Sequence, residues 1–179
     1  MPPEADLAVA PVVETSRLRL YRFTLGDADA AFMQRLMNDA DFIRHIGDRH
    51  IRSVEDARES LRAGPVACQQ AHGYSMYRMC RTSDGADIGA CGLVRRPGLP
   101  GTDLGYALLP EARGQGLARE AAHAMLPHAR AVGLDALLAI VSPGNHASVR
   151  LLASLGFQPR GTVRLTPESP ELNLFHRSL

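Results

Sequence analysis

The sequence has no tryptophan, only 5% aromatic residues and three cysteines among its 179 residues. Cys68, Cys80 and Cys91 form no CxxC pair and are odd in number, which argues against a disulfide framework and predicts a cytoplasmic protein. An excess of either charge is also missing, because 20 Lys plus Arg and 19 Asp plus Glu give a net charge of +1. Neither nucleic acid nor an anionic membrane is therefore expected as a partner.

Metal-binding and targeting patterns are missing as well. The seven histidines include no HExxH motif and no pair spaced four residues apart, so no metal is expected. No apolar run approaches the ~18 residues of a membrane span. Residues 1–11 lack both a positive charge and a long apolar core, so they do not predict a signal peptide. We expect a soluble protein, either a monomer or a homodimer.

Hydrophobic periodicity predicts one mixed domain. Residues 1–14, with several prolines and alanines, are expected to form a flexible arm, and residues 15–179 a single domain with a sizeable core. The predicted element order is β, α, α, β, β, β, α, β, α, β, β. The predicted strands are 17–23, 74–81, 87–95, 103–109, 136–142, 157–165 and 172–177, and the predicted helices are 24–38, 53–64, 117–132 and 145–156.

This order predicts an α+β (mixed α/β) fold with a central, mostly antiparallel sheet of six to seven strands and helices on both faces. The strand–helix–strand unit over 103–142 is a right-handed crossover, which makes one parallel pair. Ser53 and Asp56 are a capping box for the second helix, which Gly64-Pro65 is expected to close. Residues 39–52 are expected to be a loop or a broken helix, and Pro127 should bend the helix that contains it.

The turn Arg113-Gly114-Gln115-Gly116 lies between a predicted strand and a predicted helix. N–H groups at a helix start lack intrahelical partners, and glycines let that backbone approach a ligand, so the turn predicts a phosphate site. A Walker loop is excluded because the turn is followed by neither Lys nor a hydroxyl residue. A dinucleotide loop would need a small residue where Arg119 stands.

A second motif follows the next strand: an Asn-containing segment from Asn145 to Gly156-Phe157. Together with the glycine turn it resembles the GNAT superfamily of acyl-CoA-dependent N-acyltransferases. The family signature (Arg/Gln)-x-x-Gly-x-(Gly/Ala) is matched by Arg113, Gly116 and Ala118.

The chain also resembles one branch of that superfamily. Gly105-Tyr106 before the turn and Ser148 after Asn145 are most similar to the branch containing ribosomal-protein N-terminal (alanine or serine) acetyltransferases. The resemblance runs from about residue 14 to the C-terminus.

The resemblance implies that the parallel strands splay apart and that acyl-CoA lies in the resulting V. The turn's N–H groups would bind the pyrophosphate, and the strand edge would pair with the pantetheine arm. Asn145 would reach the cofactor or cap its helix, and the two roles are compatible. The implied cofactor-binding residues are Leu108, Leu109, Arg113, Gly114, Gln115, Gly116, Leu117, Ala118 and Asn145.

The resemblance also implies direct attack of an amine on acetyl-CoA in a ternary complex, without a protein nucleophile. Such a reaction needs a base, an oxyanion donor and a proton or hydrogen bond for the thiolate. The family's usual acid, a Tyr, is replaced by Leu152, and Ser148 is the expected substitute. Asp103 or a water chain would be the base, with Tyr106 on the opposite face of the strand.

The expected activity is an acyltransferase that moves an acetyl group from acetyl-CoA, as cosubstrate, to a primary amine. A peptide or protein N-terminal α-amine is favoured over a small amine by branch resemblance alone. Mixed charge at 42–52 and at Glu168, Glu171 and His176 does not favour polyamines or aminoglycosides. A non-catalytic acyl-CoA-binding module and, more distantly, a dinucleotide-binding protein are the alternatives.

Overall fold

A computed structural model describes residues 10–179 of the chain. Residues 1–9, most of the expected arm, lie outside the described residues. Within the rest of that stretch, Val13–Glu14 form a short strand, β1, which pairs with the next strand of the chain. The part of residues 1–14 closest to the domain is thus part of the sheet.

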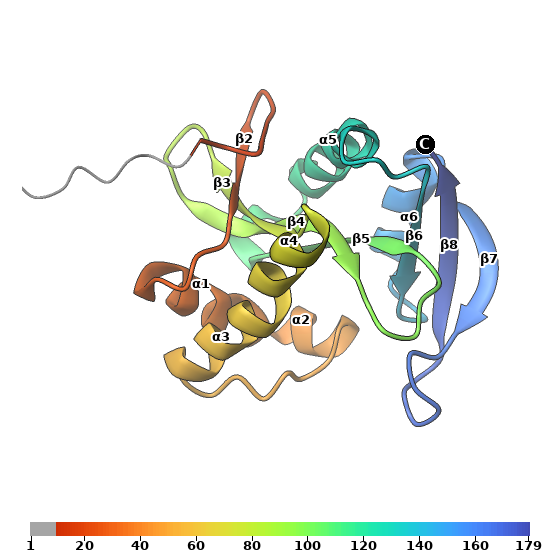
Figure 1. Ribbon diagram of the computed structural model, residues 1–179, viewed down its shortest axis with the longest axis horizontal. Helices are drawn as coiled ribbons and strands as arrows, with labels where there is room; N and C mark the ends of the chain where they lie inside the picture. Colours follow the sequence, from red (N-terminus) through yellow and green to blue (C-terminus); the bar gives the residue numbers. More distant parts are fainter. Residues whose placement is uncertain (1–9) are drawn as a thin grey trace, which may run out of the picture.

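The core of the fold is one eight-stranded sheet in the order β1-β2-β3-β4-β5-β6-β8-β7 (Figure 1). All neighbouring strands are antiparallel except β5 and β6, which confirms the mostly antiparallel α+β fold with one parallel pair. Counting the two-residue β1 takes the sheet beyond the expected six to seven strands. The other strands are β2 Leu18–Arg22, β3 Met76–Arg81, β4 Asp87–Arg95, β5 Thr102–Leu108, β6 Ala136–Val141, β7 Gln158–Val163 and β8 Leu172–Ser178.

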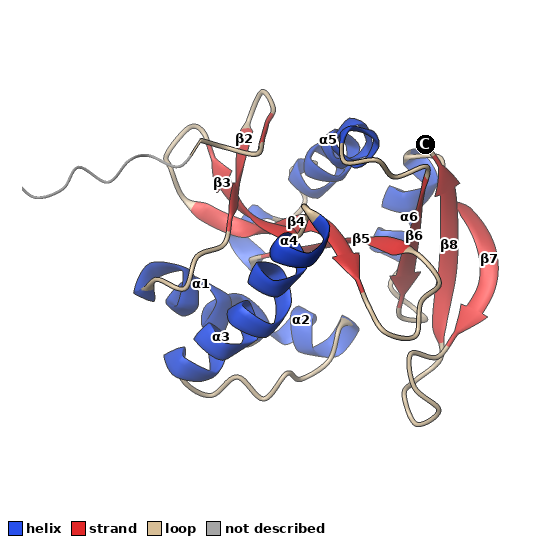
Figure 2. Cartoon of the chain, in the orientation of Figure 1, coloured by secondary structure: helices blue, strands red, loops and turns tan. Residues whose placement is uncertain are grey.

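Helices cover both faces of the sheet, as expected (Figure 2). α5 and α6 pack on the face where Leu104, Tyr106 and Leu108 point, and α1 and α3 pack on the face of Ala107 and Leu109. The six helices in the described part of the chain are α1 Asp27–Met37, α2 Ala40–His45, α3 Val54–Leu61, α4 Ala67–His72, α5 Leu117–Ala131 and α6 His146–Ser154.

The predicted end of the second helix, at Gly64-Pro65, was wrong. Its start is the expected capping box, with Ser53 Oγ accepting from Asp56 N at 3.0 Å and Asp56 Oδ2 accepting from Ser53 N at 2.8 Å. The helix does not stop at Pro65, because a π-helical turn, Arg62–Val66, carries the chain past it into α4. The wider turn accommodates a ring that a regular α-turn would exclude. Gly73, in the left-handed conformation, ends the helix instead.

The parallel pair is joined only at its beginning. β5 and β6 pair at Asp103 and Leu138, although β5 continues to Leu108 and β6 to Val141, and the two strands take different directions in Figure 2. Leu109 N donates to Ile88 O, so the odd-numbered residues of β5 bond to β4. Its even-numbered residues therefore turn their N–H and C=O groups toward the gap. The result is a V-shaped opening with one free backbone edge.

Candidate active site

The glycine turn forms an uncapped helix start at the open end of the V. Gly114 and Gly116 have φ of +72° and +75°, a conformation that side chains rarely adopt. Gly116 is the N-cap of α5 and offers no side-chain cap. Within residues 10–179 the N–H groups of Leu117, Ala118 and Arg119 have no backbone acceptor. Consecutive free donors at the positive end of a helix dipole make this turn an anion cradle.

A cavity of about 350 Å³ lies directly against this cradle. Arg119 Nε donates to Ser154 Oγ at 3.0 Å, which joins α5 to α6 beside the cavity. The sequence prediction missed Arg119 and Arg150 as lining residues, since no motif marks them. The lining residues are Leu108, Gly114, Gly116, Leu117, Ala118, Arg119, Arg150, Leu151 and Ser154, and they include five of the expected cofactor-binding positions.

Two other expected cofactor residues are occupied with structural contacts. Leu109 is buried in the core, and its N–H bonds to β4, so of the expected strand edge only Leu108 faces the V. Gln115 accepts a hydrogen bond from Arg17 Nη1 on its carbonyl oxygen at 2.9 Å and donates to Glu111 O at 3.0 Å. Both contacts hold the turn in shape.

Arg113 points away from the cradle. Its backbone N–H donates to Pro110 O at 3.2 Å, so this N–H is not a free donor. Its guanidinium donates to Leu108 O at 2.9 Å and to Asp41 at 2.8 Å, and it also pairs with Asp39. The side chain therefore links the end of β5 to the start of α2.

Tyr106 and Ser148, both predicted site residues, are brought together inside the V. Their hydroxyl oxygens lie 2.5 Å apart, with either one donating. Burial raises the pKa of Tyr106 to about 12, so this hydroxyl stays protonated at neutral pH. Asn145 accepts from Ser148 N at 3.2 Å and caps α6, the second of its two expected roles. Leu152, at the position of the family's usual acid, is buried in the core.

Asp103 lies at the closed end of the V and is 1% exposed. Arg96 Nε donates to both of its carboxylate oxygens, at 2.9 and 3.1 Å. Burial raises the pKa of Asp103, and the positive charge of Arg96 opposes that rise. The β4–β5 register is continuous, so Asp103 and Tyr106 lie on opposite faces, as expected.

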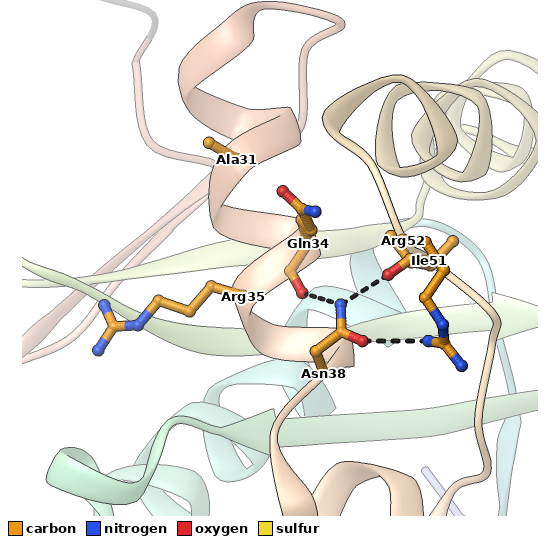
Figure 3. A pocket seen from close by; sticks show the side chains of 6 residues that line it. All are labelled: Ala31, Gln34, Arg35, Asn38, Ile51 and Arg52. Carbon is orange, nitrogen blue, oxygen red and sulfur yellow. Dashed lines mark hydrogen bonds between the residues drawn. The ribbon is translucent and has the colours of Figure 1, made fainter.

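A second hollow, of about 400 Å³, lies outside the V, between α1 and residues 51–52 (Figure 3). Asn38 fills its floor, donating to Gln34 O and Ile51 O at 2.8 Å each and accepting from Arg52 at 3.3 Å. Arg35 points away from the others and pairs with Glu111. With its central amide already bonded, this hollow offers less for chemistry than the cradle.

The described part of the chain contains neither a metal-binding cluster nor a membrane-spanning helix. Among residues 10–179, no group of three or more His, Cys, Asp or Glu side chains is placed to hold a metal ion. No helix in the same range has the length and apolar character needed to cross a bilayer.

Comparison with known proteins extends over nearly the whole chain. The Acetyltransferase (GNAT) domain pattern matches residues 17–158. The uncharacterized N-acetyltransferase YoaA of Bacillus subtilis is 29% identical over 157 residues, 86% of each chain. A putative GnaT-family acetyltransferase from Bordetella pertussis has a TM-score of 0.75 at 25% identity, over 93% of this chain and 98% of that one. An acetyl transferase of Salmonella typhimurium that modifies the N-terminal serine of ribosomal protein L7/L12 has a TM-score of 0.75 at 19% identity, over 94% and 98%.

Proposed function

Since this chain belongs to the acetyltransferase (GNAT) family and is an acetyl-CoA-dependent N-acetyltransferase, we propose that its acceptor is the N-terminal α-amine of a peptide or protein. The Tyr106–Ser148 pair, at the inner end of a V whose open end is an anion cradle, supports the acetyl-transfer chemistry that this acceptor would undergo. The likeness in fold to the Salmonella enzyme, which modifies an N-terminal serine, supports the same acceptor class.

The free backbone groups of this chain assign a place to each part of acetyl-CoA. The N–H groups of Leu117, Ala118 and Arg119 receive the pyrophosphate, with the Arg119 and Arg150 guanidinium groups beside it. The pantetheine arm pairs with the edge of β5 like an added strand. Leu108 C=O already accepts from Arg113, so the groups offered to the arm are Leu108 N–H and Tyr106 C=O, which leaves Tyr106 N–H for the thioester.

The same edge supplies catalytic groups at the thioester. As the amine attacks the carbonyl carbon, Tyr106 N–H donates to the developing oxyanion. The Tyr106–Ser148 pair donates a hydrogen bond to the departing sulfur. The pKa of Tyr106, about 12, lies far above that of an ordinary thiol, so the pair stabilises the thiolate and does not protonate it fully.

The attacking amine must lose a proton before or during attack. We assign this role to Asp103, because its burial makes the carboxylate more basic and it lies at the closed end of the V. Arg96 holds both carboxylate oxygens and keeps the group oriented. The alternative base is a water chain to bulk solvent, which the pH profile of an Asp103→Asn variant distinguishes.

The acceptor class is tested by measuring CoA release with matched amines. One series contains short peptides with a free N-terminus, a second contains the same peptides Nα-blocked with one free lysine, and a third contains small amines. The chain contains no lysine, so its own side chains add no primary amine to the assay. We expect turnover only with the free N-termini. A kcat/KM for small amines that equals or exceeds the best peptide would overturn the proposal.

A further inference from the structure

α2 crosses the open V and is fastened at both ends. At its start, Asp39 and Asp41 pair with Arg113, which follows β5. At its last residue, His45 O accepts a hydrogen bond from Ser142 Oγ, which follows β6. The two strands that diverge without pairing are thus joined through a six-residue helix.

The Arg113 end of this connection is built from shared contacts. Asp39 Oδ2 accepts from Asp41 N and Phe42 N at 3.1 Å each and so caps α2, while it also pairs with Arg113. The Asp39 side chain is only 8% exposed. One guanidinium therefore bonds the cap of α2 and the terminal carbonyl of β5, at Leu108, at the same time.

We propose that Arg113 is a positioning residue that fastens α2 to the end of β5 and thereby shapes the acceptor side of the V, and that it does not bind the cofactor phosphates. The proposal rests on the acetyl-CoA placement given above, but on no particular acceptor. It runs against the simplest interpretation of an arginine in a phosphate-binding turn, namely that its charge contacts the phosphate.

Local charge supports this assignment. Two carboxylates accompany the Arg113 guanidinium, so the group offers no net positive charge to a pyrophosphate. Arg119 and Arg150 line the cavity, and within residues 10–179 neither forms an ion pair. The charge available to the phosphates therefore comes from α5 and α6, and Arg113 remains with α2.

The experiment separates cofactor binding from acceptor use. CoA dissociation constants are measured by calorimetry without acceptor, and kcat and KM are measured with any amine that supports turnover. The variants are Arg113→Gln, Ser142→Ala at the other end of α2, and Arg119→Gln in the cavity. Arg35→Gln is the matched control, because it removes an exposed arginine that pairs with Glu111 in the same region without touching α2.

We expect Arg113→Gln to raise the acceptor KM about tenfold, because the variant loses a charge-assisted hydrogen bond. The CoA Kd should stay within about threefold of the wild-type value. Ser142→Ala should move the acceptor KM in the same direction, and Arg35→Gln should move neither quantity. Arg119→Gln should show the opposite split, with a CoA Kd that is about tenfold higher and less salt-dependent than that of Arg113→Gln, because the phosphates have lost a charge that salt can screen.

A CoA Kd raised tenfold or more by Arg113→Gln, with the acceptor KM unchanged, would overturn the proposal. If Arg113→Gln does not fold, Asp41→Asn and Ser142→Ala carry the test, since each removes one contact only, and an unchanged acceptor KM in both contradicts it. Because any amine substrate serves, failure of the peptide acceptor assay leaves this test intact. The two proposals therefore fail separately.

Discussion

Replacing Gly114 with alanine isolates the contribution of the cradle's backbone. Gly114 has φ of +72°, and a Cβ built there meets nothing within 4 Å, so the substitution adds conformational strain without a clash. A left-handed conformation costs a non-glycine residue about 1–2 kcal/mol. Relaxation of the turn removes that strain in the free protein and must be reversed when CoA binds. A cost of about 1 kcal/mol then weakens CoA binding about fivefold.

Gly133→Ala is the matched control at the other end of the same helix. Gly133 has φ of +87° and also has nothing within 4 Å of a built Cβ, but it lies at the C-terminal end of α5. Thermal unfolding should show a Tm lower by about 2–4 °C for each kcal/mol lost in either variant. Calorimetry should show weaker CoA binding for Gly114→Ala alone. Equal CoA affinities in the two variants would refute the role assigned to this backbone.

Four further substitutions test three catalytic groups and one structural carboxylate. Tyr106→Phe and Ser148→Ala should each lower kcat about tenfold by weakening the hydrogen bond to the sulfur. An unchanged kcat in both variants would count against a catalytic role for this pair. The kcat of the wild type should show no descending limb from Tyr106 below about pH 11. Asp103→Asn should remove the ascending limb of the kcat/KM–pH profile, which lies above the ordinary Asp pKa because burial raises the pKa of Asp103; an unchanged limb would assign the base to water. Glu120→Gln should lower the free energy of unfolding by about 1–2 kcal/mol, because Glu120 accepts hydrogen bonds from Arg17 N and Nε. Burial alone would raise the pKa of Glu120, but these bonds outweigh it and lower the pKa. The stability advantage of the wild type should therefore persist above the pKa of Glu120 in the unfolded chain and disappear as pH falls through its pKa in the folded protein.

Local signals in the sequence predicted most of the fold. The capping box of Ser53 and Asp56 and the glycines at 114 and 116 act within a few residues, so their roles can be inferred from spacing. The helix end at Pro65 could not be inferred in this way, because a π-helical turn depends on how the whole segment packs. Gly73 carries the end signal, eight residues after the proline.

Whether a site residue could be assigned correctly depended on how far along the sequence its partners lie. Tyr106 and Ser148 came from family resemblance, and the structure brings them into contact. Arg113 could not be assigned correctly from its motif, because its partners Asp39 and Asp41 lie more than 70 residues earlier and no local pattern connects them. Only the folded chain places α2 across the V.

The most direct test of the account is amide hydrogen exchange at residues 114–119 with and without CoA. In the described chain the N–H groups of Leu117, Ala118 and Arg119 lack acceptors, so they should exchange rapidly in the free protein. Saturating CoA should slow their exchange strongly, while the C-terminal end of α5 changes little. Unchanged exchange at these three amides, under conditions where calorimetry shows bound CoA, would contradict the placement of the pyrophosphate on this helix start.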